Sequence, residues 1–286
     1  MLEQIETIAA LRTRLEGEAP QVRSEGRSRG LVPTMGALHA GHAALIRTAR
    51  HECDVVVVSI FVNPLQFDNP DDLARYPHTL DADLALCRGH GVDIVFRPSP
   101  AEMYPEPPEC TVDVGRLADH LCGKFRPGHF RGVATVVLKL FETVRPHRAY
   151  FGEKDAQQLA IVRRLTADFN VPVTIVEVPT VREADGLAIS SRNRHLTKEQ
   201  RASAVCLYGA LIEARRLIAS GERNSEAIRT EAAATIRRSD SLRLEYLEIV
   251  DPATMQPVDE VTGDVRVAGA VWVGPTRLID NLLVRR

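Results

Sequence analysis

The chain has 286 residues, of which 44% are hydrophobic and 26% are charged. This composition is typical of a soluble globular protein, and the length is sufficient for two domains. The 36 basic and 38 acidic residues leave a net charge of −2, which argues against a general nucleic-acid-binding role. No apolar run reaches the roughly 18 residues that span a bilayer, so we expect neither a nucleic-acid nor a membrane partner.

The cysteines indicate a reducing compartment. They are odd in number, widely spaced and never form a C-x-x-C pair: Cys53, Cys87, Cys110, Cys122 and Cys206. A disulfide framework or a structural zinc site is therefore disfavoured. The first 18 residues show a mixed-charge helical pattern rather than a secretory signal. We accordingly expect a cytoplasmic protein.

The first two thirds of the chain alternate between strand and helix patterns. The residue patterns predict strands at 31–33, 54–62, 93–96, 149–151 and 173–178, and helices at 41–53, 73–89, 133–144 and 155–168. The run D-V-V-V-V-S-I-F-V at 54–62 is typical of a strand that is buried on both faces. This alternation predicts an α/β fold with a Rossmann-like parallel sheet, whose ligands lie beyond the carboxyl ends of the strands.

After Pro179 the order of the elements changes. Helices are predicted at 197–220 and 225–237, followed by strands at 242–250, 264–273 and 276–283. Helices followed by strands indicate a separate and smaller α+β domain. We therefore assign residues 1–182 to the Rossmann-like domain and residues 183–286 to a C-terminal α+β lid domain.

The segment V-P-T-M-G-A-L-H-A-G-H at 32–42 lies where a predicted strand passes into a helix. It nearly fits a phosphate-binding P-loop, but His42 and Ala43 occupy the lysine and hydroxyl positions, so we reject that interpretation. His39 and His42 share one face of the helix start, beside backbone N–H groups that suit a phosphate. The alternative is that one histidine caps the helix and the other is solvated.

Two further donor clusters follow predicted strands or linkers. In G-E-K-D at 152–155, Lys154 would suit a phosphate, or it would be a solvated lysine beside a capped helix. In I-S-S-R at 189–192, two hydroxyls precede an arginine, which matches phosphate geometry, although this segment would also serve as a polar linker between domains.

Amides and acids supply weaker signals. Gln66 follows the most buried predicted strand, and Gln158 lies one helical turn after Asp155. Either amide would face the ligand crevice or simply satisfy backbone groups. Asp81 and Asp83 would suit magnesium, although carboxylates on a helix face are usually solvated. The segment R-P-G-H-F-R-G at 126–132 is either a substrate loop or a connector.

Taken together, these segments resemble the pantothenate synthetase family, the pantoate–β-alanine ligases. The resemblance runs through nearly the whole chain and is carried by P-T-M-G-A-L-H-A-G-H at 33–42, F-V-N-P-L-Q-F at 61–67, R-P-G-H-F-R-G-V at 126–133, F-G-E-K-D-A-Q-Q-L at 151–159 and V-P-T-V-R-E-A-D-G-L-A-I-S-S-R-N at 178–193. It implies membership of the nucleotidyltransferase superfamily with HIGH-type and KMSKS-type motifs. It also implies a homodimer.

The resemblance assigns residues to the site. The catalytic residues would be His42, His39, Lys154 and Arg192. ATP would be held by Pro33, Thr34, Met35, Gly36, Ala37, Leu38, His39, Ala40, Gly41, His42, Gly152, Glu153, Lys154, Asp155, Val181, Ile189, Ser190, Ser191 and Arg192. Pantoate and β-alanine would be bound by Gln66, Gln158, Asn63, Arg126 and His129. Mg²⁺ would accompany ATP, with Asp83 as a candidate ligand.

The reaction that the resemblance implies has two steps. The carboxylate of pantoate attacks the α-phosphate of ATP, giving pantoyl adenylate and pyrophosphate, and the amine of β-alanine then displaces AMP. Two departures from the family pattern are Ile189, where methionine is usual, and Ala82, where an acidic residue is usual. Another adenylate- or cytidylate-forming nucleotidyltransferase and a non-catalytic nucleotide-binding module are the alternatives.

Overall fold

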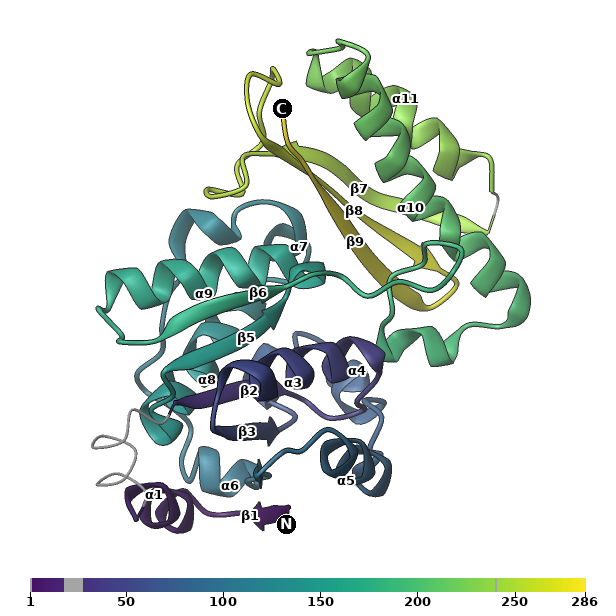
Figure 1. The fold of residues 1–286 in the computed structure, drawn as a ribbon. Helices are drawn as coiled ribbons and strands as arrows, with labels where there is room; N and C mark the ends of the chain where they lie inside the picture. Colours follow the sequence, from purple (N-terminus) through teal and green to yellow (C-terminus); the bar gives the residue numbers. More distant parts are fainter. Residues whose placement is uncertain (1, 18–27, 240) are drawn as a thin grey trace. The chain divides into compact units, whose positions relative to one another are not determined.

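The computed structural model describes residues 2–17, 28–239 and 241–286. The chain forms two compact units (Figure 1). Unit 1 comprises Met1–Val114, Arg126–Glu153 and Ile161–Pro179, and unit 2 comprises Gly115–Phe125, Lys154–Ala160 and Thr180–Arg286. The units are thus not separated at a single position, because two earlier segments join the C-terminal part. A domain boundary between residues 182 and 183 stays a prediction.

Unit 1 contains a parallel sheet of six strands, which confirms the Rossmann-like α/β prediction. The strands are β1 (Glu3–Ile5), β2 (Arg29–Thr34), β3 (Val55–Ile60), β4 (Ile94–Phe96), β5 (Arg148–Gly152) and β6 (Thr174–Val178), in the spatial order β1-β4-β3-β2-β5-β6. The pattern did not predict β1, because three residues are too few to show a period of two.

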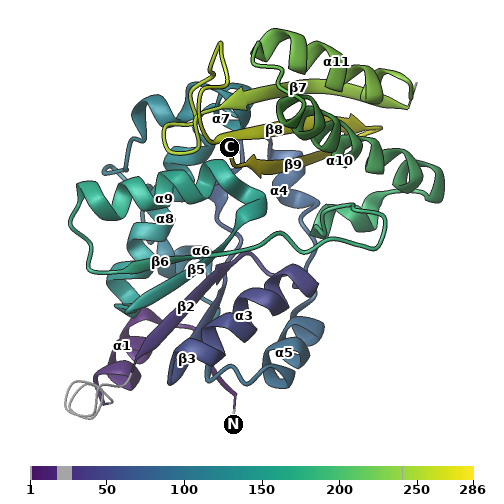
Figure 2. The same cartoon turned by 45° about the horizontal axis from the view of Figure 1, so that its top comes forward.

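Both faces of this sheet are covered by helices, namely α1 (Ile8–Glu16), α3 (Ala40–Glu52), α5 (Leu80–Gly89) and α8 (His129–Val144), together with part of α9 (Ala156–Asp168). Val56 and Val58 of β3 pack in one cluster with Ile46 of α3. Val55 and Val57, which alternate with these two residues along the strand, are also buried, on the other face. Helix α3, which lies beside β2 and β3 in Figure 2, packs against β2, β3 and β5, whereas α8 contacts β2 and α1. Burial on both faces explains the continuous β-branched run of β3.

One helix prediction was wrong. Residues 73–89 do not form a single helix, because α4 (Pro70–Ala74) ends before Pro77 and α5 begins only at Leu80. Proline disfavours helical backbone in the residue before it, here Tyr76, so the chain breaks at this point. Two other short helices, α6 (Pro100–Met103) and α7 (Leu121–Phe125), were not predicted.

Unit 2 contains the expected smaller α+β arrangement. Helices α10 (Lys198–Ala219) and α11 (Ser225–Arg237) pack on an antiparallel sheet of β7 (Leu242–Val250), β8 (Val265–Val273) and β9 (Thr276–Val284), in the order β7-β8-β9. Leu211, Ile228 and Val267 are fully buried in the core between these layers. Helix α10 begins with a capping box between Thr197 and Gln200, at the position where its pattern starts.

The strand order defines where unit 1 would bind a ligand. Strand β2 is paired with β3 on one side and with β5 on the other. The strands that follow β2 are first added on the β3 side and later on the β5 side, so the order of strands reverses beside β2. Ligands of such sheets bind at the carboxyl ends of the strands beside this switch point. The segments that leave these ends are Met35–His39 after β2 and Glu153 after β5.

Candidate functional site

The loop that follows β2 is held by a buried carboxylate. Asp83 of α5 is 2% exposed, and it accepts hydrogen bonds from the backbone N–H groups of Ala37 (2.9 Å) and Leu38 (2.8 Å) and from the hydroxyl of Thr79 (3.0 Å). Gly36 and Ala37 both have positive φ, a conformation that is unfavourable for alanine. The two hydrogen bonds that the Asp83 carboxylate accepts therefore stabilise a strained loop next to the switch point.

The histidine pair caps helix α3 with both side chains. The Nδ1 atom of His39 accepts from the N–H of Gly41 at 3.1 Å, and the Nδ1 atom of His42 accepts from the N–H of His39 at 3.2 Å. The two rings lie with their centroids 4.0 Å apart. An accepting Nδ1 carries no proton, so each neutral ring has its N–H donor at Nε2. The capping alternative and the donor function are thus compatible, because they use different nitrogen atoms.

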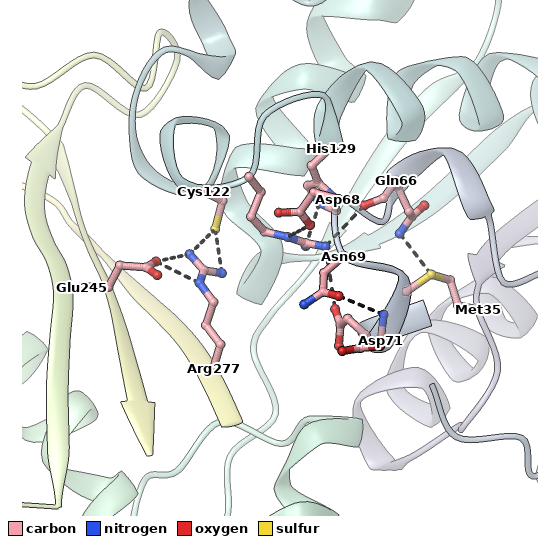
Figure 3. Close-up of polar contacts among 11 residues, drawn as sticks. Met35, Gln66, Asp68, Asn69, Asp71, Cys122, His129, Glu245 and Arg277 are labelled. Carbon is pink, nitrogen blue, oxygen red and sulfur yellow. Dashed lines mark hydrogen bonds and ion pairs between the residues drawn. The ribbon is translucent and has the colours of Figure 1, made fainter. Parts of the chain in front are cut away.

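Gln66 is fixed by a close approach between two elements. It ends the 3₁₀ turn η1 (Pro64–Gln66), which packs against Gly132 of α8. A Cβ atom on Gly132 would lie 2.3 Å from the carbonyl oxygen of Leu65, so only glycine fits there. Gln66 is 8% exposed, and its Nε2 atom lies 3.0 Å from the sulfur of Met35 (Figure 3). This contact joins the loop after β3 to the loop after β2.

Arg126 and His129 hold the backbone of Gln66. The Nδ1 atom of His129 lies 2.7 Å from the Gln66 carbonyl oxygen and must donate to it (Figure 3). Arg126 donates to the same oxygen at 3.3 Å. Arg126 also pairs with Asp68 at 3.3 Å. The segment at 126–132 is therefore more than a connector, since it clamps the turn that carries Gln66.

In unit 2, three of the expected phosphate-binding groups line one pocket. Lys154, Ser190 and Arg192 lie around it together with Tyr208 and Asp280. The Lys154 side chain is 18% exposed, and its nitrogen is 3.6 Å from a carboxylate oxygen of Asp155. The cations of Lys154, Arg192 and Arg277, together with the Ser190 hydroxyl, give this concave site the chemistry that an anionic ligand requires.

A buried ion pair supports this pocket. Arg182 donates two hydrogen bonds to the carboxylate of Asp280, at 2.6 and 2.9 Å, and its guanidinium lies 4.2 Å from the ring centroid of Tyr208. Burial raises the pKa of Asp280, and the neighbouring Arg182 acts in the opposite direction. The next residue, Asn281, donates to the carbonyl oxygen of Lys154 at 2.9 Å. Sequence reasoning missed this network, because β9 lies about 100 residues beyond Arg182.

The other expected residues of unit 2 are placed differently. Val181 and Ile189 are joined by a backbone hydrogen bond of 3.0 Å in a short hairpin whose turn contains Gly186 at positive φ. Gln158 is half-buried on α9, and neither it nor Ser191 lines the pocket of Lys154 and Arg192.

The described part of the chain holds neither a metal-binding cluster nor a membrane-spanning helix. Within residues 2–17, 28–239 and 241–286, no three side chains of His, Cys, Asp or Glu are grouped so that they would hold a metal ion. Nor does this part of the chain contain a helix with the length and apolarity needed to cross a membrane.

Comparisons with known proteins agree with one another. The model of the family described as "Pantoate-beta-alanine ligase" matches residues 3–283. A pantothenate synthetase of Heliobacterium modesticaldum is 54% identical, covering 91% of this chain and 92% of the relative. The crystal structure of pantothenate synthetase from Thermus thermophilus matches with a TM-score of 0.92 and 45% identity, over 99% of this chain and 100% of that one.

Two further matches concern ligands and length. A pantoate-beta-alanine ligase structure from Francisella tularensis, complexed with β-γ ATP and β-alanine, matches with a TM-score of 0.80 and 34% identity, over 99% of this chain and 98% of that one. A bifunctional pantoate ligase/cytidylate kinase of Thermosynechococcus vestitus is 51% identical over 99% of this chain, which spans only 55% of that relative.

Proposed function

This chain belongs to the pantoate-beta-alanine ligase family and is a ligase of that kind, and we propose that its own residues divide the work of condensing pantoate with β-alanine between the two units. The family resemblance of the sequence is thereby confirmed. In the first step the pantoate carboxylate attacks the α-phosphate of ATP and expels pyrophosphate. In the second, the β-alanine amine attacks the acyl carbon of pantoyl adenylate and expels AMP, giving pantothenate.

The first step needs alignment and compensation of charge rather than a general base. A carboxylate is already nucleophilic at neutral pH, whereas the phosphate gains charge as the oxygen approaches. The Nε2–H groups of His39 and His42, with the N–H groups at the start of α3, would donate to this charge. Lys154 and Arg192 would compensate the triphosphate. Convergence of these groups on one ATP is part of the proposal.

Pantoate needs neutral partners for its hydroxyl groups. We assign this role to the amides of Gln66 and Gln158, with Asn63, Arg126 and His129 acting around Gln66. The buried position of Gln66 excludes water from its amide, which makes each hydrogen bond to a substrate oxygen more selective.

Mg²⁺ would be carried by the polyphosphate of ATP, and it would supply neutralisation of the negative charge there. The Asp83 carboxylate was expected to be a ligand. Because both of its oxygens accept backbone N–H groups, we assign it first to holding the loop that ends at Leu38. Its role toward the metal stays a prediction, which the Asp83→Asn experiment below tests.

We also propose that the enzyme is a cytoplasmic homodimer. All five cysteines are free, as a reducing compartment would allow. The homodimer follows from the family resemblance alone. Sedimentation equilibrium at micromolar concentration should give twice the mass of 31.6 kDa, and a monomer throughout that range would contradict this part of the proposal.

The observation that carries the proposal is the pocket that brings Lys154, Ser190 and Arg192 together within unit 2. The test is the release of pyrophosphate from ATP. It should require pantoate, and neither CTP nor an alcohol phosphate should replace the substrates. Lys154→Met should lower this rate roughly 10²-fold or more, judged from the loss of one preorganised charge. The exposed Lys198→Met is the matched control, and an unchanged rate for Lys154→Met would remove this pocket from the reaction.

A further inference from the structure

A chain of three polar side chains leads from Tyr104 to the proposed pantoate site. The Tyr104 hydroxyl lies 3.0 Å from Oδ1 of Asn63, and Nδ2 of Asn63 lies 3.2 Å from Oε1 of Gln66. Asn63 is 1% exposed. All three residues belong to unit 1, and nothing in the sequence spacing links Tyr104 to the other two.

The direction of each hydrogen bond in this chain is fixed by a backbone carbonyl. Nδ2 of Asn63 also lies 3.1 Å from the carbonyl oxygen of Gly132, which can only accept, so the amide nitrogen must be on that side. Oδ1 of Asn63 then faces Tyr104 and the N–H of Leu65, and the Tyr104 hydroxyl must donate. The remaining proton of Nδ2 is donated to Oε1 of Gln66.

The amide of Gln66 is therefore oriented with its NH₂ group outward. Its Nε2 atom is directed at the sulfur of Met35, a weak acceptor that an oxygen atom of a ligand would readily replace (Figure 3). With the opposite orientation, Gln66 would present an oxygen and would repel a carboxylate or a hydroxyl lone pair. The Gly132 carbonyl thus sets the polarity of this site, and the Tyr104 hydroxyl, two hydrogen bonds from the Gln66 amide, holds the Asn63 amide in that orientation.

We propose that Tyr104 is a positioning residue that orients Gln66 through Asn63, so that the enzyme selects a substrate oxygen as acceptor. The inference rests on the proposed binding of pantoate at Gln66. Burial raises the pKa of Tyr104 to about 12, so the hydroxyl keeps its proton at neutral pH. The ring has separate support, because Phe61 lies 6.1 Å away between ring centroids and the Lys139 ammonium lies 5.1 Å from the Tyr104 ring centroid. Removal of the hydroxyl alone should consequently leave the fold intact.

The experiment compares Tyr104→Phe with Tyr150→Phe. Tyr150 is a buried tyrosine of the same sheet unit whose hydroxyl meets Cys53 and Glu52 instead. Tyr104→Phe should raise the KM for pantoate about tenfold, the size expected for one lost buried hydrogen bond, and leave the KM for ATP within twofold. Tyr150→Phe should change neither constant. An equal rise in both KM values for Tyr104→Phe would overturn the inference, because it would show a general structural effect.

A double-variant cycle separates this inference from the proposed function. If Tyr104 acts through Gln66, then Tyr104→Phe should add less than about twofold to the KM for pantoate in a Gln66→Ala background. Full additivity would overturn the positioning role while leaving Gln66 as a pantoate ligand. If Gln66→Ala itself left the KM for pantoate unchanged, the assignment of Gln66 would fail, and the inference would fail with it.

Discussion

The two units build their polar sites from different kinds of group. In unit 1 the groups that would face a ligand near the switch point are backbone N–H groups, the imidazoles of His39 and His42, and the amide of Gln66, whereas the charged Asp83 and Arg126 are bonded to the backbone of these loops. In unit 2 they are charged, with Lys154 and Arg192 around a pocket. Neutral donors in fixed directions determine orientation, whereas cations compensate a polyphosphate. Under the proposed function, alignment of the reacting atoms and neutralisation of charge would be assigned to separate parts of the chain.

The largest expected effect concerns the stability of unit 2. Asp280→Ala leaves Arg182 without its carboxylate partner and should lower the free energy of unfolding of unit 2 by about 3–5 kcal/mol. Trp272, the one tryptophan of the chain, lies in β8 of this unit and reports its urea unfolding by fluorescence. The control is Arg216→Ala, which breaks an exposed pair with Glu213 and should cost about 1 kcal/mol or less. Equal losses in the two variants would show that burial adds nothing to the Arg182 pair.

The second largest effect concerns catalysis by groups of unit 1. His42→Ala removes one N–H donor and should slow pantoyl adenylate formation roughly 10²-fold to 10³-fold in a single turnover. The exposed His51→Ala, on the same helix, should not change the rate. An unchanged rate for His42→Ala would leave charge compensation to unit 2 alone.

A smaller effect distinguishes loop support from metal binding. Asp83→Asn replaces one accepting oxygen by an NH₂ group that faces a backbone N–H, so the loop at Ala37 and Leu38 should loosen. The KM for ATP should rise about tenfold, as expected for a buried donor that has lost its acceptor. The exposed Asp81→Asn, on the same helix, is the control.

The metal dependence of Asp83→Asn decides between the two roles. If Asp83 supports the loop, the requirement for Mg²⁺ should be the same as in the unsubstituted enzyme. A rise in the Mg²⁺ concentration needed for half-maximal rate, together with rescue by Mn²⁺, would contradict loop support and identify a metal ligand.

The smallest effect is expected at the short hairpin of unit 2 that joins Val181 to Ile189. Ile189→Met restores the residue that is usual in the family, and the backbone N–H of Ile189 bonds to Val181 whatever the side chain. Rates and KM values should change less than twofold. A large change would show that the side chain at this position contacts the nucleotide in a way that packing does not explain.

The elements that could be predicted from the sequence are those that depend on the local periodicity of hydrophobic residues. The buried run of β3, the alternation that leads to the parallel sheet, and the capped helix α10 were all predicted correctly, because hydrophobic spacing and caps act within a few residues. The single helix expected at 73–89 was wrong, because Pro77 outweighed a good helical pattern.

The supports of the site were not predictable in this way. Asp83 bonds to Ala37, 46 residues before it, and Tyr104 bonds to Asn63, 41 residues before it. These contacts depend on how β strands are ordered in the sheet, which the spacing of residues does not encode. The motifs identified the groups that would touch a substrate, whereas the groups that hold them emerged only from the folded chain.

Transfer of oxygen from pantoate tests the central claim most directly. With ¹⁸O in the pantoate carboxylate, attack on the α-phosphate followed by amine attack on the acyl carbon must leave one ¹⁸O atom in AMP. Mass spectrometry of the products after complete turnover with ATP and β-alanine should therefore find singly labelled AMP and unlabelled pyrophosphate. Unlabelled AMP, with ¹⁸O in phosphate or pyrophosphate instead, would contradict the adenylate mechanism that both units are proposed to serve.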